Sequence, residues 1–119
     1  AIRPGFAAVA EISPAVGEEL FDTGVNMGTA VPRVWFQEIL NGLNQQGRDY
    51  ADIAEDGQIG PGTLAAYRAL RAKRGSAAAD EVMLKALNCK QGARYIELAR
   101  GRAANEDFLF GWLRTRVAL

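Results

Sequence analysis

Helix start and stop signals recur along this chain, and no segment shows the alternating pattern of a strand. Ser13-Pro14 places an N-cap residue before a first-turn proline, while Gly28 and Gly47 follow apolar runs at helical spacing. The predicted helices cover residues 14–27, 29–46, 61–73 and 77–99, and a last one is capped by Asn105. The chain is therefore expected to be all-α, with about five helices around the long one at 77–99.

The long predicted helix carries apolar residues on two sides, which is typical of a central position. The first face consists of Val82, Ala86, Cys89, Ala93 and Ile96, and the second of Leu84, Leu87, Tyr95 and Leu98. We expect the Cys89 thiol to be buried in the core. In the last helix, the spacing of Phe108, Phe110 and Trp112 favours core packing over a platform for sugar rings.

Residues 56–64 combine a tight turn, one apolar anchor and a helix start. Asp56-Gly57 provides a turn in which glycine takes a positive φ, Ile59 points inward, and Pro61 stands where a helix needs no N–H group. Asp56 and Thr63 flank this helix start, whose N–H groups can receive a carbonyl or a carboxylate. The alternative is a purely structural loop-to-helix junction.

The polar side of helix 14–27 contains residues that helix stability would not choose. Asp22, Thr23, Gly24 and Asn26 together cost on the order of 2 kcal/mol relative to good helix formers. Asp22 and Asn26 lie one turn apart on the same face, so a carboxylate and an amide could line a sugar-binding cleft. An ordinary polar face with a close-packed Gly24 is the alternative.

Composition excludes several kinds of chemistry. The chain has no histidine, which removes histidine-based triads and histidine-ligated zinc and leaves carboxylates for proton transfer. Fourteen basic and fourteen acidic residues cancel, so no net charge favours nucleic acid. The calcium-loop pattern fails after Asp52, because Ala54 and Thr63 stand where ligands are needed. We predict no metal, no cofactor and no integral membrane segment.

Five segments in order resemble glycoside hydrolase family 108, the lysozyme-like N-acetylmuramidases also called secretion activators. They are Glu19 to Gly28, Trp35 to Asn41, Asp56 to Pro61, Ala93 to Leu98 and Phe110 to Arg114. The later half resembles the predicted peptidoglycan-binding domain that follows the catalytic part of that family. The resemblance implies a lysozyme-like helical fold, with residues 1–47 from the end of the catalytic region and 48–119 as the peptidoglycan-binding region, in one compact unit.

The resemblance also implies what this chain lacks. The family's catalytic glutamate precedes a Gly-Gly-Ala-Thr type sequence, and nothing similar occurs before Glu11. Asp22, the one possible cleft carboxylate, and Asn26 match the helix that faces the family's substrate cleft, while Gly62 replaces a residue that is more often charged or polar. No residue is predicted to be catalytic, and the start at Ala1, which is no signal peptide, suggests a fragment of a longer protein.

We therefore expect the peptidoglycan-binding part of a cell-wall hydrolase that cleaves the β-1,4 glycan link, inactive alone and acting at the bacterial cell wall. The expected partners are the glycan and its stem peptide, the missing N-terminal segment or a second copy. The candidate binding residues are Asp22, Asn26, Asp56, Thr63, Arg94 and Tyr95. Arg94 could pair with a stem-peptide carboxylate, whereas the structural interpretation is stronger for Tyr95. Two alternatives are a helical interaction module of a phage or secretion system, and weak hydrolase activity through Glu18 or Glu19.

Overall fold

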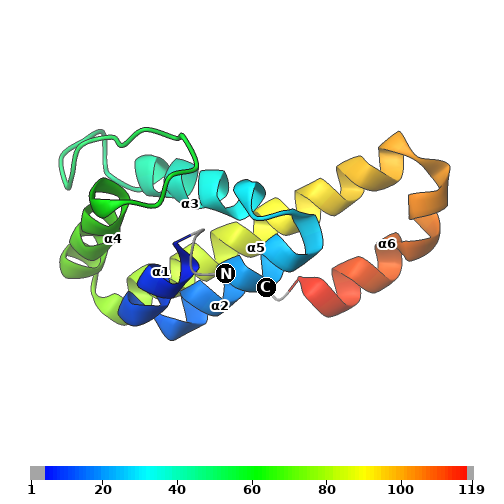
Figure 1. The fold of residues 1–119 in the computed structure, drawn as a ribbon, viewed down its shortest axis with the longest axis horizontal. Helices are drawn as coiled ribbons and strands as arrows, with labels where there is room; N and C mark the ends of the chain where they lie inside the picture. Colours follow the sequence, from blue (N-terminus) through cyan, green and yellow to red (C-terminus); the bar gives the residue numbers. More distant parts are fainter. Residues whose placement is uncertain (1–4, 118–119) are drawn as a thin grey trace. The chain divides into compact units, whose positions relative to one another are not determined.

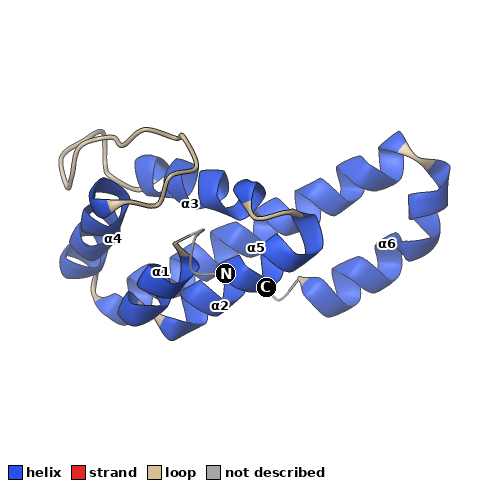
Figure 2. Ribbon diagram, viewed as in Figure 1, coloured by secondary structure: helices blue, strands red, loops and turns tan. Residues whose placement is uncertain are grey.

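All regular structure in residues 5–117, the part of the chain that the computed structural model describes, is helical (Figure 1, Figure 2). The helices are α1 (Phe6–Ile12), α2 (Pro14–Met27), α3 (Ala30–Gly42), α4 (Pro61–Arg74), α5 (Ser76–Gly101) and α6 (Ala103–Arg116). This confirms the predicted all-α class. Our interpretation of residues 1–4 as the start of a fragment lies outside the described residues.

The start and stop signals of α2 and α4 act where the sequence places them. The Ser13 hydroxyl accepts a hydrogen bond from the Val16 N–H at 3.4 Å, and Pro14 opens α2. Gly28 ends α2 with φ 91°, and Gly75 separates α4 from α5 with φ 89°, a backbone conformation that favours glycine. The predicted bounds of α2 and α4 are therefore correct to within one residue.

Two boundary predictions are wrong, and one helix is missing from the prediction. The helix α1 was not predicted. α3 ends at Gly42 rather than near residue 46, because Gln45 and Gln46 adopt left-handed φ values of 56° and 62°. Asn105 lies inside α6, where its side-chain N–H donates to the Leu98 carbonyl at 3.1 Å instead of capping the helix.

Backbone contacts divide the chain into two compact units, Ala1–Leu84 and Lys85–Leu119, with the division inside α5. In the first unit α1 contacts α2 and α4, while α3 contacts α2 and α4. A Cβ on Gly17 would lie 2.5 Å from the Ala10 Cβ, so only glycine permits the observed approach of α1 to α2. The functional division expected after residue 47 stays a prediction.

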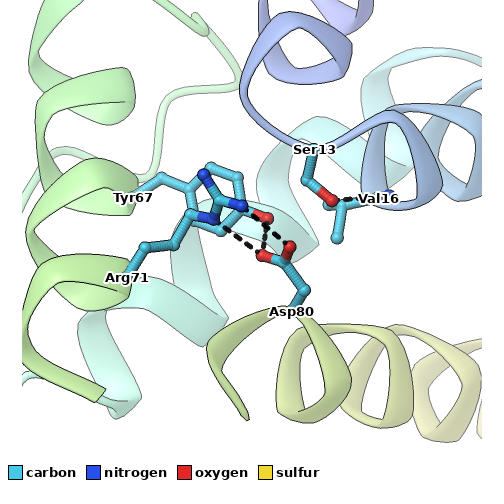
Figure 3. Close-up of polar contacts among 5 residues, drawn as sticks. All are labelled: Ser13, Val16, Tyr67, Arg71 and Asp80. Carbon is cyan, nitrogen blue, oxygen red and sulfur yellow. Dashed lines mark hydrogen bonds and ion pairs between the residues drawn. The ribbon is translucent and has the colours of Figure 1, made fainter. Parts of the chain in front are cut away.

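A polar cluster joins α4 to the start of α5 (Figure 3). Asp80 accepts a hydrogen bond from the Tyr67 hydroxyl at 2.5 Å and two from the Arg71 guanidinium, at 3.1 and 3.2 Å. Burial, followed by the bond to Asp80, raises the pKa of Tyr67 above its ordinary value. Because Tyr67 is fully buried and its ring meets Phe36 edge-on at 5.2 Å, this cluster fixes α4 against both α3 and α5.

The second unit is built on aromatic contacts between α5 and α6. The Trp112 ring lies 5.2 Å from that of Tyr95 and 6.0 Å from that of Phe108, measured between centroids. A Cβ on Gly92 would lie 3.8 Å from a methyl carbon of Leu113. One stripe of α6 therefore packs on α5.

Two predictions of burial are wrong. On the first face of α5, Val82 and Ile96 are 43% and 46% exposed, and Cys89 is exposed, because packing covers the side of the helix that carries Leu87 and Tyr95. In α6, Phe108 and Phe110 are 56% and 76% exposed. A unit this small has too little interior to enclose every apolar residue of its helices.

Candidate functional site

Three amide side chains along one side of α3 hold the loop that leads to α4. Gln37, Asn41 and Asn44 follow one another at spacings of four and three residues, so they share one side of the helix and its C-terminal extension. Gln37 and Asn44 are 0% and 2% exposed. Buried amides require hydrogen-bond partners, and backbone and side-chain groups of the loop and of the first turn of α4 supply them.

Gln37 is the centre of this arrangement. Its amide nitrogen donates to the Asp56 carboxylate at 3.2 Å, to the Gln58 carbonyl at 3.0 Å and to the Thr63 hydroxyl at 3.1 Å. Its amide oxygen accepts from the Gly57 N–H at 2.7 Å. Gly57 has φ 76°, as the sequence predicts for the turn after Asp56. One side chain therefore joins α3, the 56–58 turn and the first turn of α4.

Asn41 and Asn44 hold the earlier part of the loop. Asn41 exchanges two hydrogen bonds of 2.8 Å with the backbone of Ile53, as a neighbouring strand would. Asn44 donates to the Asp52 carboxylate and accepts from the Gly47 N–H at 3.0 Å. Tyr50 adds a bond of 2.7 Å to the Leu40 carbonyl, and burial raises its pKa to about 12. The loop is thus ordered by side chains rather than by secondary structure.

Two hollows open beside this loop. The first has a volume of about 260 Å³, and its lining residues are Gln37, Ile53, Ala54, Asp56, Gln58, Gly60, Gly62 and Thr63. The second has a volume of about 610 Å³, and its lining residues are Asn41, Gly42, Asn44, Gln46, Gly47, Ala51 and Asp52. Amide and carboxylate groups are present in both linings, and the first also has the Thr63 hydroxyl, so both hollows suit a polar ligand.

The structure brings two of the predicted site residues, Asp56 and Thr63, to the first hollow. Asp56 is exposed, and its pKa is lowered by the bond from the Gln58 N–H and then by that from Gln37. α4 begins after Gly60 without a side-chain cap, so no side chain of the described residues occupies the N–H groups of its first turn. A carboxylate acceptor and helix N–H donors therefore lie around one hollow.

The weak helix formers of α2 divide into two groups. Thr23 is 1% exposed and donates to the Glu19 carbonyl at 2.8 Å, while a Cβ on Gly24 would lie 3.2 Å from the Phe6 ring. These two residues have structural roles. Asp22 and Asn26 are exposed, and their role as cleft residues stays a prediction.

The apolar residues of α2 are only partly buried. Phe21 and Val25 are 46% and 69% exposed, whereas Val16 and Leu20 are fully buried. The reason is that Thr23 and Gly24, rather than Phe21 and Val25, face the neighbouring helices.

The remaining two predicted site residues lie in the second unit. Arg94 is exposed, and its guanidinium lies 4.0 Å from the carboxylate of Glu97, which is also exposed and stands three residues later on α5. Tyr95 is 2% exposed, donates to the Gln91 side chain at 3.2 Å and packs against Trp112. These contacts give Tyr95 a structural role, while a ligand-binding role for either residue stays a prediction.

Sequence reasoning missed the residues that organise the site, Gln37, Asn41 and Asn44. The signal that could have identified them is the repetition of amides along the otherwise apolar face of a predicted helix.

Within residues 5–117, no group of three acidic or cysteine side chains is placed to hold a metal ion. No helix in that part of the chain is both long and apolar enough to cross a membrane.

Comparison with known proteins supplies the family. Residues 31–117 match the family described as "Predicted Peptidoglycan domain", and the match includes α3 apart from its first residue, the amide-held loop and both hollows. A comparison with curated proteins finds no match. Since the matched segment covers well over half of the sequence, the chain belongs to the family of predicted peptidoglycan domains.

Proposed function

We propose that this chain binds peptidoglycan through the two hollows beside the loop that Gln37, Asn41 and Asn44 hold. The observation that carries the proposal is the first hollow, where the exposed Asp56 carboxylate and the uncapped start of α4 lie together. Peptidoglycan offers acetamido and peptide carbonyls to helix N–H groups, and it offers N–H and hydroxyl groups to a carboxylate.

The second hollow extends this polar surface along the loop. In its lining, the Asn44 amide donates a hydrogen bond to the Asp52 carboxylate. These two groups are therefore oriented before any ligand arrives. Such preorganisation lowers the entropic cost of binding. A glycan strand with its stem peptide is long enough to contact both hollows, and we assign the two to one extended ligand.

The resemblance to glycoside hydrolase family 108 supports a more specific proposal. The parent protein is a lysozyme-like N-acetylmuramidase, and this chain is a C-terminal portion of it that is inactive alone. In that setting Asp22 and Asn26 line the glycan cleft, which fits their exposure on α2. Without the family's acidic residue before Gly-Gly, the pair of carboxyl groups that glycoside hydrolysis needs is incomplete.

Sacculus binding by two glutamate variants tests the proposal. A Cβ on Gly62 would meet no atom within 4 Å, so Gly62→Glu fits the fold, places a carboxylate in the first hollow and favours the helix start electrostatically. Ala65→Glu adds the same charge at an exposed position of α4 that does not line the hollow. Purified sacculi should retain the unmodified chain and Ala65→Glu in a pulldown, and should lose most of Gly62→Glu.

Two outcomes of that pulldown would overturn the proposal. The first is equal recovery of the unmodified chain in the supernatant with and without sacculi. The second is equal retention of the two glutamate variants, which would show that the hollow is not the contact. Thermal unfolding of each variant confirms that a loss of binding does not reflect a loss of structure.

The exposed aromatic residues of α6 favour a second candidate function. Phe108 and Phe110 leave apolar surface uncovered, as expected of a helical interaction module in a phage or secretion-system assembly. Light scattering separates the two functions. A monomer that binds sacculi supports peptidoglycan recognition, and a stable oligomer that ignores sacculi supports the interaction module.

A further inference from the structure

A third hollow, which is apolar, lies where α4 meets the start of α5 in the unit Ala1–Leu84, and Leu43 in its lining stands in the chain between Gly42 and Asn44 of the second loop hollow. Its volume is about 390 Å³, within the range of roughly 300–1,000 Å³ that is common for small-molecule sites. Its lining residues are Leu43, Leu70, Arg74, Ala78, Ala79 and Val82. Leu70 and Ala79 are each 2% exposed and form its buried side, while Arg74, Ala78 and Val82 are exposed.

Arg74 is the single charged residue among those six. Within residues 5–117 its guanidinium forms no hydrogen bond or ion pair, in contrast to Arg71 one turn earlier, which binds Asp80 through two bonds. Arg71 therefore has a structural partner. The charge of Arg74 opposes the rise that burial causes in the pKa of Tyr50, but the N–H groups of Arg74 are available to an anion. A guanidinium binds a carboxylate through two parallel hydrogen bonds, which fixes both position and orientation.

The lining also selects against a sugar. It has no amide or hydroxyl side chain for sugar hydroxyls, in contrast to the two hollows of the proposed peptidoglycan site, both of which have amides in their linings. Alanine, valine and leucine side chains instead favour small apolar groups such as methyls. A ligand that fits this hollow therefore combines small aliphatic groups with one carboxylate.

We propose that this hollow binds the D-alanine end of the peptidoglycan stem peptide, with a methyl group against Leu70 and Ala79 and the terminal carboxylate on Arg74. The inference rests on the proposed function, because peptidoglycan recognition is what brings that peptide to the chain. It deepens that function by assigning the glycan and the free peptide end to different hollows. The polar loop hollows hold the glycan and its attached peptide backbone, and the apolar hollow holds the free peptide end.

The position of Arg74 in the last turn of α4 has a competing explanation, since a cation there stabilises the helix dipole. Lys73 provides the matched control. It lies in the same turn, is exposed and does not line the hollow. Arg74→Gln and Lys73→Gln each remove one positive charge from the helix end, so a difference between them in ligand binding cannot come from the dipole.

The test is an NMR titration of the full chain with N-acetyl-D-alanyl-D-alanine and with its C-terminal amide. We expect the acid to shift backbone resonances of the six lining residues, and the amide to bind about tenfold more weakly, the effect of losing one charge-assisted contact. Arg74→Gln should weaken binding of the acid to the same extent, and Lys73→Gln should leave it unchanged. Ala78→Leu fills the hollow from α5 and should abolish binding of the acid, whereas Ala77→Leu, which lies outside the lining, should leave that binding intact.

The outcomes distinguish this inference from the proposed function. Sacculus binding without any response to the dipeptide, or with equal affinity for acid and amide, overturns the peptide-end site and leaves peptidoglycan recognition intact. Dipeptide binding that depends on Arg74, without retention on sacculi, supports the site and contradicts the proposed function. Equal weakening by Arg74→Gln and Lys73→Gln would show that the charge of the helix end, rather than the hollow, is responsible.

Discussion

Replacing Gln37 by methionine should destabilise the fold and disorganise the site together. Methionine keeps the length of the side chain and removes its amide. The lost contacts are those with the Asp56, Gln58 and Thr63 oxygens and with the Gly57 N–H. Because Gln37 is 0% exposed, water cannot easily replace these partners.

The magnitude follows from counting the bonds that can act at once. An amide has two N–H donors, so at most two of the three donated bonds are strong, and the bond from Gly57 is the third strong one. At about 1 kcal/mol for each net hydrogen bond, plus the cost of the buried and unpaired Gly57 N–H, we expect a loss of about 2–4 kcal/mol. Against a typical stability of about 5–15 kcal/mol, the variant should still fold.

Urea unfolding followed by circular dichroism measures this loss, and hydrogen exchange at the Gly57 amide reports the loop directly. Gln58→Met is the matched control, because the Gln58 side chain is exposed and forms no hydrogen bond within residues 5–117. The control should change stability by less than about 0.5 kcal/mol. A loss below about 1 kcal/mol for Gln37→Met, or unchanged protection of Gly57, would refute the role assigned to Gln37.

Two further predictions concern packing and pH. Gly17→Ala should lower the free energy of unfolding by about 1–3 kcal/mol in thermal melts, because its Cβ would lie 2.5 Å from that of Ala10. Gly42→Ala is the control, because its Cβ would meet no atom within 4 Å, and it should not destabilise the fold. The pKa of Asp56 is lowered from 3.8, so the stability it contributes is present above pH 3.8 and is lost as pH falls through its folded value. In denaturant titrations at a series of pH values, Asp56→Asn should remove that part of the loss of stability at low pH. The same loss of stability in the variant and the unmodified chain would contradict this assignment.

The proposed peptidoglycan site and the fold depend on the same side chains. Gln37, Asn41 and Asn44 satisfy the backbone of a long loop and, in doing so, shape the surface of both loop hollows. Long loops in compact domains that lack regular structure are often functional. Here the family match covers the loop and the helix that holds it.

The sequence by itself determined the helical class and most helix ends, because caps, prolines and glycines act through their immediate neighbours. Ser13-Pro14 and Gly75 mark helix ends in the structure as local chemistry predicts. The junction at residues 56–64 was also predictable from adjacent residues: Gly57 has the expected positive φ, and Pro61 begins α4.

Only the tertiary structure decided which side of each helix is covered and which distant groups meet. Periodicity showed two apolar faces on α5, but packing covers the side with Leu87 and leaves Cys89 exposed. The contact between Gln37 and Thr63 joins residues 26 positions apart, and no local propensity encodes it. Burial and long-range hydrogen bonds depend on the placement of whole helices, whereas helix ends depend on a few adjacent residues, and this difference explains why the fold class was predictable and the organisation of the site was not.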